Sequence, residues 1–452
     1  MTNKKGRNFQ LFTILTEKMG MTEIRKWLED SKRIGMSLGL ENTHKVLTKL
    51  SLDLSNTTII HVAGSNGKGT TCAMISVALT IAGHDNILFS SPHLCRVEER
   101  IRLNGVPISD DKFDDAINQV RDICDQLSIT LTFFEITYIC SKIIASQNNV
   151  EYLILETGLG GRLDATRCSK ADVCLLTSIT KEHSDILGQD IYQIIAEKAA
   201  IARPNKPLIV RRMHYEEFTQ TVEKIANNCG QEHLGESSGI AQCKYVAIND
   251  ETSVLGEAEI LASAVLTELK LGQDAIKMAK EVLNWPGRLQ LINVDSQLFL
   301  LDSGHNPSGL SRVKPQLCEM IQRYSANGKW NLLFATSPQN DLAQMMEIVN
   351  DIIQQDSCET IVLTKPLGGR YPGVEPSKLE NMISQSSNII STDTPSEALE
   401  YLLSKSSDIN GLIVSFGSLY LQGNILTHLG LDSDENLSLI AKPSKITTDT
   451  EG

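Results

Sequence analysis

A glycine-rich stretch with one lysine, HVAGSNGKGTT (61–71), has the residue types that bind phosphate. Phosphate needs backbone N–H groups at a helix start, glycines that allow close approach, and a lysine for the outer oxygens. The common spelling G-x-x-x-x-G-K-[ST] is not met, because Val62 replaces its first glycine and an extra glycine follows the lysine. A tight turn without a ligand is the alternative. A β-branched run before the loop and two threonines after it favour phosphate binding by Gly64, Ser65, Asn66, Gly67, Lys68, Gly69, Thr70 and Thr71.

Alternating strands and helices must position this loop. The run TTIIHVA (57–63) predicts a strand before it, and TTCAMISVALTIAG (70–83) predicts a helix after it. Further buried strands are predicted over 152–157, 171–179 and 207–210, with a crossover helix over 133–147. The alternation predicts a large N-terminal domain of the α/β class, P-loop-type and doubly wound.

A second, smaller α/β unit is predicted after NWPGRLQLI (284–292). Its expected strands are LFLLD, NLLFATS, ETIVLTKP and GLIVSFGS, with helices such as PSEALEYLLS between them, as in a Rossmann-like domain. Pro286 and Gly287 suit a linker, so we expect domains over 1–286 and 287–430, with a ligand cleft between them. The polar residues 431–452 predict a disordered tail.

Composition limits the partners. The 452 residues include 42 Lys and Arg against 55 Asp and Glu, a formal net charge of −13, without a basic block for nucleic acid. Small-molecule partners are therefore expected. No apolar run reaches the length of a membrane span, and the start has no signal-peptide pattern. The ten cysteines include no C-x-x-C pair, and apolar runs contain Cys72, Cys140 and Cys174. This pattern indicates reduced thiols and a cytoplasmic location.

A set of motifs carries a resemblance to a known family. In order they are GLENTHKVL, GSNGKGT, SSPHL, ERIRLNGVPIS, FFE, LETGLGGRLDATR, HSDILG, AEKAAIARP, NWPGRLQ, LDSGHNPSG and GSLYL. From about residue 38 to 422 the chain resembles the folylpolyglutamate synthase and dihydrofolate synthase family of Mur-type ATP-dependent amide ligases. The resemblance implies a monomeric ligase that adds L-glutamate to dihydropteroate, to reduced folates, or to both, through an acyl phosphate.

The resemblance also implies two magnesium ions. Ser91 and Glu156 would hold one, and Glu156, His183 and Lys198 the second. A lysine ammonium has no lone pair for a metal, so the resemblance implies that Lys198 is carbamylated. From the residues alone, a surface lysine, a solvated histidine and an ordinary strand-end carboxylate remain the alternatives. Lys68, His183 and Lys198 would be the catalytic residues.

The second domain is expected to close the nucleotide site. By resemblance, Arg288 and His305 would contact the phosphates and Asp302 the ribose region. The alternatives are a linker salt bridge for Arg288, a solvated loop residue for His305 and a turn-capping carboxylate for Asp302. The resemblance also implies a pterin-side site at Phe134, Asp164 and Ala165.

The sequence departs from the family at one place that concerns adenine. The family carries H-Q-x-x-N-A before a long helix, whereas this chain has Glu257, Ala258 and Leu261 at the His, Gln and Asn positions. A smaller change puts Glu182 before His183. These departures leave two alternatives open: a diverged Mur-type ligase for another carboxylate, and an inactive relative that binds nucleotide or folate.

Overall fold

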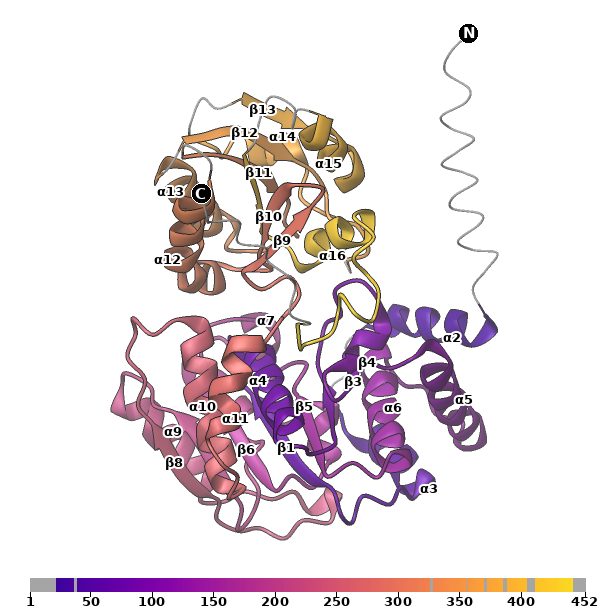
Figure 1. The fold of residues 1–452 in the computed structure, drawn as a ribbon. Coiled ribbons are helices and arrows are strands. Elements are labelled where there is room, and N and C mark those ends of the chain that lie inside the picture. The colour runs from indigo at the N-terminus through magenta and orange to yellow at the C-terminus, as the bar shows by residue number, and fades with distance from the viewer. Residues whose placement is uncertain are drawn as a thin grey trace.

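The computed structural model describes residues 22–35, 39–325, 328–355, 357–369, 372–384, 388–404 and 411–441. Two α/β domains lie one above the other in Figure 1, which confirms the expected fold class. The chain crosses from the first to the second between α11 (Asp274–Val282) and β9 (Gln290–Val294), the segment that holds the predicted boundary.

The first domain is built on an eight-stranded sheet among the described residues, in the order β4-β3-β2-β5-β1-β6-β7-β8. Six of its strands run parallel, and the hairpin β3–β4 is antiparallel at one edge. The strands are β1 (Thr58–Ala63), β2 (Asn86–Phe89), β3 (Ile101–Leu103), β4 (Val106–Pro107), β5 (Tyr152–Glu156), β6 (Val173–Leu176), β7 (Pro207–Arg211) and β8 (Gln242–Val246). Its helices besides α11 are α2 (Glu23–Ser31), α3 (Glu41–Leu50), α4 (Lys68–Ile81), α5 (Asp110–Leu127), α6 (Phe133–Gln147), α7 (Ser184–Leu187), α8 (Ile191–Ala199), α9 (Glu216–Ala226) and α10 (Val254–Glu268).

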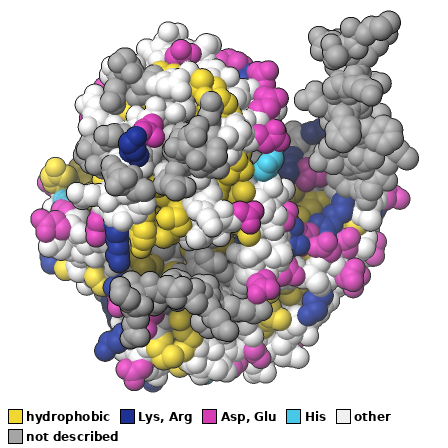
Figure 2. Space-filling model, turned by 45° about the horizontal axis from the view of Figure 1, so that its top comes forward, with side chains coloured by type: hydrophobic (Ala, Val, Ile, Leu, Met, Phe, Trp, Pro, Cys, Tyr) yellow, Lys and Arg dark blue, Asp and Glu magenta, His cyan; other side chains and the backbone are white. Residues whose placement is uncertain are grey.

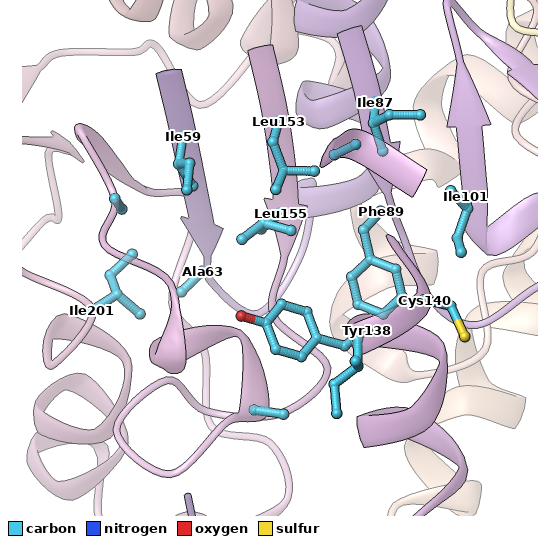
Figure 3. Close-up of a cluster of buried hydrophobic side chains, with 14 of the residues drawn as sticks. Ile59, Ala63, Ile87, Phe89, Ile101, Tyr138, Cys140, Leu153, Leu155 and Ile201 are labelled. Carbon is cyan, nitrogen blue, oxygen red and sulfur yellow. The ribbon is translucent and has the colours of Figure 1, made fainter. Parts of the chain in front are cut away.

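Both faces of this sheet are buried, because successive side chains of a strand point to opposite sides. In β1, Ile59 and Ala63 belong to the core under α5, α6 and α8, whereas Ile60 and Val62 belong to the core under α4, α10 and α11. Figure 3 shows part of the first core. There the Tyr138 ring lies 5.9 Å from that of Phe89, and its hydroxyl pairs with Ser169 Oγ at 2.7 Å.

The second domain has a six-stranded sheet among its described residues, in the order β13-β12-β11-β14-β10-β9. Only β9 is antiparallel to its neighbour. The remaining elements are β10 (Gln297–Leu301), β11 (Lys329–Phe334), β12 (Ser357–Leu363), β13 (Asn388–Ser391), β14 (Leu412–Phe416), α12 (Pro307–Tyr324), α13 (Leu342–Gln355), α14 (Pro376–Glu380), α15 (Pro395–Ser404) and α16 (Leu419–His428). No described helix of either domain combines the length and apolar composition needed to cross a membrane.

The C-terminal segment differs from the disordered tail expected after residue 430. Residues 431–441 return to the first domain, where Leu437 and Leu439 are fully buried. The Leu439 N–H donates to Gly105 O at 2.9 Å, and its carbonyl accepts from Asn284 N at 2.8 Å. The prediction was wrong for these residues, because two leucines spaced by two in a polar segment are enough to anchor it. Residues 442–452 lie outside the described part of the chain.

Candidate active site

The phosphate loop follows β1, the central strand of the first sheet. The neighbours of β1 are β5 on one side and β6 on the other, so the chain order reverses at this strand. Open α/β sheets bind ligands at such a switch point, outside the carboxyl ends of the strands. The residues that follow β2, β5, β6, β7 and β8 therefore gather on the same edge as the loop.

The loop is tied to the end of β6. Ser65 N–H donates to Ser178 O at 2.7 Å, and Thr177 Oγ1 donates to Asn66 O at 2.8 Å. Gly64 has a φ of +152°, and a Cβ there would lie 1.9 Å from Thr177 Oγ1. Only glycine fits this position, so the loop conformation follows from the sequence.

The first turn of α4 opens on the loop. This helix begins at Lys68, directly after Gly67 with a φ of +83°, and its first N–H groups have no acceptor within the helix. Lys68 Nζ donates to Gly64 O at 2.9 Å and to Ser65 O at 3.2 Å, so its charge lies over the loop. A helix start with a lysine above it is an anion-binding arrangement.

Lys198 is a buried cation beside the same loop. Only 1% of its surface is exposed, and its Nζ donates to Gly64 O at 2.8 Å and to Glu182 Oε1 at 3.0 Å. Burial lowers the pKa of Lys198 to about 8, against the opposing effect of Glu182. Burial acts to raise the pKa of Glu182, but Lys198 and Lys68 hold it below its usual value. The surface-lysine alternative is thus not what the structure has.

Glu156 and Ser91 meet at the ends of β5 and β2. The Ser91 N–H donates to Glu156 Oε2 at 3.1 Å, and the carboxylate is buried. Burial raises the pKa of Glu156, and Lys68 opposes this rise. Both residues line the cleft with the phosphate loop, and a carboxylate with a hydroxyl fits magnesium, which takes few protein ligands and completes its shell with water and phosphate.

The second predicted set of metal ligands, Glu156, His183 and Lys198, is not brought together as the pair Ser91 and Glu156 is. His183 has a φ of +47° and lines the cleft, but Lys198 is paired with Glu182 rather than with His183. Among the described residues, no three His, Cys, Asp or Glu side chains gather in a metal-binding cluster. Glu182 was missed as a site residue, although its place before His183 in the motif was the signal.

The second domain forms the opposite wall of the cleft. Arg288, Asp302 and His305 all line it. Asp302 accepts hydrogen bonds from Leu289 N at 3.0 Å and Gly304 N at 2.7 Å, as the turn-capping alternative requires. His305 Nδ1 lies 2.9 Å from Ser303 O, and Arg288 has no ion pair with a described residue.

The cleft between the walls has a volume of about 880 Å³. Trp285 lies in it, with its ring under the Arg102 guanidinium at 5.2 Å and close to Gly69. The NWPGR motif did not predict a role for this tryptophan. On the face seen in Figure 2, acidic and basic side chains are interspersed, and apolar side chains lie in the hollow below the upper domain.

Three predicted pterin-site residues lie outside this cleft. Asp164 accepts from Gly158 N at 2.8 Å and Leu159 N at 2.9 Å, and Ala165 is buried. Phe134 packs on the same loop, since a Cβ on Gly158 would lie 2.6 Å from its ring. Asp164 and Phe134 therefore support the 158–159 segment, which does line the cleft.

The three residues that replace the family's His, Gln and Asn lie in different surroundings. Glu257 and Ala258 line the cleft, whereas Leu261 is fully buried in the core of the first domain. Glu257 pairs with Arg211 at 3.0 Å and with Arg312 of the second domain at 2.7 Å. An ion-paired carboxylate therefore stands where a neutral polar motif was expected.

Comparisons with known proteins agree with this arrangement. Residues 62–254 match the Mur ligase middle domain. The dihydrofolate synthase/folylpolyglutamate synthase of Bacillus subtilis is 27% identical over 440 residues, covering 90% of this chain and 98% of that protein. The protein of the same description from Escherichia coli is 29% identical over 350 residues, covering 74% of this chain and 80% of that protein.

Solved structures share the fold. The bifunctional folylpolyglutamate synthase/dihydrofolate synthase of Yersinia pestis, complexed with AMPPNP and a manganese ion, superposes with a TM-score of 0.74 at 26% identity, covering 91% of this chain and 99% of that chain. Escherichia coli FolC with DHPP and ADP gives a TM-score of 0.75 at 24% identity, covering 90% and 98%, and supports the fold.

Proposed function

Because this chain belongs to the family of Mur-type ligases that contains the dihydrofolate synthases and folylpolyglutamate synthases, we propose that it joins L-glutamate to a pterin-linked carboxylate. The enzyme is an ATP-dependent carboxylate–amine ligase. Its acceptor is dihydropteroate, which becomes dihydrofolate, or a reduced folate, which becomes a polyglutamate, or both.

One observation carries the proposal: Lys68 and Lys198 both donate to the carbonyl of Gly64, and Glu156 is the last residue of the adjacent strand β5. Joining a carboxylate to an amine requires a good leaving group on the carboxylate, and transfer of the ATP γ-phosphoryl group supplies one as an acyl phosphate. The triphosphate and the substrate carboxylate repel each other. Lys68, which stays a cation over the loop, offsets part of that repulsion.

The residues act as follows. The first turn of α4 and Lys68 hold the outer phosphates, and Arg288 and His305 approach them from the second domain. Magnesium held by Ser91 and Glu156 would add positive charge beside the phosphates. The substrate carboxylate attacks the γ-phosphorus and ADP leaves. The glutamate amine then attacks the acyl carbon, phosphate departs, and the amine loses a proton. Closure by the second domain keeps water from the acyl phosphate.

We further propose that Lys198 is carbamylated. Its neutral amine attacks carbon dioxide, forms a nitrogen–carbon bond and releases one proton, which turns a cation into an oxygen-bearing anion. The pKa of about 8 produced by burial provides the neutral amine near physiological pH. The new charge would lie beside Glu182 and near His183, a donor set that suits a second magnesium ion.

The finer features of the proposal follow the family. Phe134, Asp164 and Ala165 form the pterin side, next to the 158–159 segment of the cleft that Asp164 and Phe134 support. The protein works as a monomer on small molecules in the cytoplasm, without nucleic acid as a partner. Buried thiols such as Cys72, Cys140 and Cys174 suit a reducing compartment.

The test incubates the protein with Mg-ATP, bicarbonate and L-glutamate, with dihydropteroate in one reaction and a reduced folate in another. Mass spectrometry is expected to find one added glutamate in the first, or a ladder in the second, and Lys68→Ala is the control. ADP without either product would identify a ligase for another carboxylate. Absence of ADP would favour a nucleotide- or folate-binding protein.

A further inference from the structure

An ion triplet of two buried residues, Glu257 and Arg211, and the half-buried Arg312 joins the two domains beside the cleft. Glu257, on α10 of the first domain, pairs with Arg211 at the end of β7 and with Arg312 on α12 of the second domain. Glu257 is 7% exposed and Arg211 8%. The Glu257 carboxylate contacts both guanidinium groups. Its Oε1 faces Arg211 Nε, and its Oε2 faces Arg312 Nη2.

Within the described part of the chain, the side-chain hydrogen bonds of Arg312 all cross the domain boundary. Besides Glu257 it donates to Asp250 O at 2.6 Å and to Thr252 O at 2.7 Å, both just before α10. One turn further along α12, Gln316 Oε1 accepts from Val254 N at 3.4 Å. A guanidinium with three acceptors in fixed directions sets an orientation as well as a distance.

The same helix carries the second-domain wall of the active site. Ser308, one turn before Arg312, accepts a hydrogen bond from Asn66 Nδ2 of the phosphate loop at 3.1 Å. His305 comes just before Asn306, the N-cap of α12. Four residues of helix rise only about 6 Å, so a shift of Arg312 moves His305 and Ser308 relative to the loop.

We propose that Glu257 is a positioning residue for the nucleotide: by binding Arg211 and Arg312 together, it places the second-domain wall over the phosphate loop. The catalytic role of Glu257 rests on the proposed function. Its effect on nucleotide binding does not depend on which carboxylate is the substrate. A buried ion pair fixes geometry more than it adds stability, because desolvation offsets much of the attraction. Each domain has hydrophobic cores of its own, so losing the triplet should not unfold either one.

The experiment measures binding of Mg-AMPPNP by calorimetry in the wild type, Glu257→Gln, Arg312→Gln and the double variant. Each single variant should weaken binding at least tenfold, and the double variant should be no weaker than the worse single variant, because both remove the same interaction. Arg312→Lys keeps the charge but not the forked geometry, so it should fall between wild type and Arg312→Gln.

Matched controls lie on the same two helices. Glu259→Gln removes the pair of α10 with Lys280 within the first domain, and Lys314→Gln removes the pair of α12 with Asp351 within the second. Both should bind nucleotide as the wild type does. With steady-state assays, the variants of the triplet should raise KM for ATP more than they lower kcat, while KM for the carboxylate substrate stays within threefold.

The outcomes separate the two claims. Unchanged Mg-AMPPNP affinity in Glu257→Gln and Arg312→Gln, with unfolding temperatures near that of the wild type, overturns the positioning role. Additive losses in the double variant also overturn it, since they mean independent contacts. Weakened nucleotide binding in a protein that ligates neither dihydropteroate nor folate supports the inference and rejects the proposed substrate.

Discussion

The two walls of the cleft are built in different ways. On the first-domain wall, Lys68 and Lys198 converge on the Gly64 carbonyl, and Glu182 pairs with Lys198. On the second-domain wall, Arg288 and His305 are exposed to the cleft, and their segment is held by backbone hydrogen bonds and by Asp302. The first wall is assembled by adjacent strands of one sheet, whereas the second depends on how the domains meet.

The difference has electrostatic consequences. Groups of the first wall are buried next to one another, so the pKa values of Glu156, Glu182 and Lys198 are all shifted. A site with fixed charges need not reorganise when a phosphate arrives, which is how preorganised sites lower barriers. The second wall can instead move with its domain. We therefore expect changes in the first wall to abolish chemistry and changes in the second to weaken binding.

Lys68→Ala should have the largest effect. It removes the cation over the loop, and we expect kcat/KM for ATP to fall by about a thousandfold or more. Single-turnover formation of ADP is the measurement, and Lys45→Ala on the surface of α3 is the control. Residual activity above a tenth of wild type would mean that the first wall does not carry the charge compensation.

Lys198→Ala should follow, with a loss of about 100- to 1,000-fold in kcat. Lys198→Arg keeps a cation that cannot form a carbamate, so it should be equally inactive. Mass spectrometry of the intact wild-type protein, after gentle handling in bicarbonate, should find the added carbamate, and neither variant should carry it. An active Lys198→Arg protein would remove the carbamate from the mechanism.

The pH dependence of reactivation gives a second test of carbamylation at Lys198. Its lowered pKa of about 8 means that the neutral amine increases as pH rises through 8. The neutral fraction of the lysine is therefore small at pH 6.5 and much larger at pH 8.5. Protein stripped of carbon dioxide should therefore regain activity much faster at pH 8.5 than at pH 6.5 when the concentration of dissolved carbon dioxide, the species that the amine attacks, is held equal at the two values. Equal rates at the two values would contradict a buried, carbamylated lysine.

Arg288→Ala tests the second wall and should have a smaller effect. Loss of one exposed, charged hydrogen-bond donor should lower kcat/KM by about 10- to 100-fold, mostly through KM for ATP. Arg288→Lys should recover part of the loss because the charge remains. A decrease in kcat as large as that of Lys68→Ala would erase the distinction between the walls.

The first wall was predictable because its residues follow strands that the sequence marks clearly. The β-branched run before Gly64 and the apolar run before Glu156 locate two adjacent strand ends, and the sheet brings them together. The pairing of Lys198 with Glu182 was not predictable from local pattern, because it joins a loop to a helix sixteen residues away through tertiary packing.

The contacts between the domains were the least predictable part. Arg312 and Glu257 are separated by 55 residues, and neither stands in a pattern that indicates a partner. Strands β8 and β13 were also missed, because their side chains are mostly exposed or half-buried and no apolar run marks them. Edge strands and domain contacts depend on surfaces that form only after each core has packed.

A change in the C-terminal segment 431–441 should have the smallest effect on catalysis and the clearest effect on stability. Leu439 is buried in the core that also holds α4, α10 and α11, and its backbone bonds to both Gly105 and the linker residue Asn284. Leu439→Ala should destabilise the protein by about 2–5 kcal/mol through lost burial and a cavity. Activity at 20 °C should stay within about threefold of wild type, because the first wall has its own supports. Leu127→Ala, the same change at an exposed leucine of α5, is the matched control and should leave the urea midpoint nearly unchanged. A large fall in activity without a fall in stability would show instead that this segment, through Asn284, positions the linker and with it the second wall.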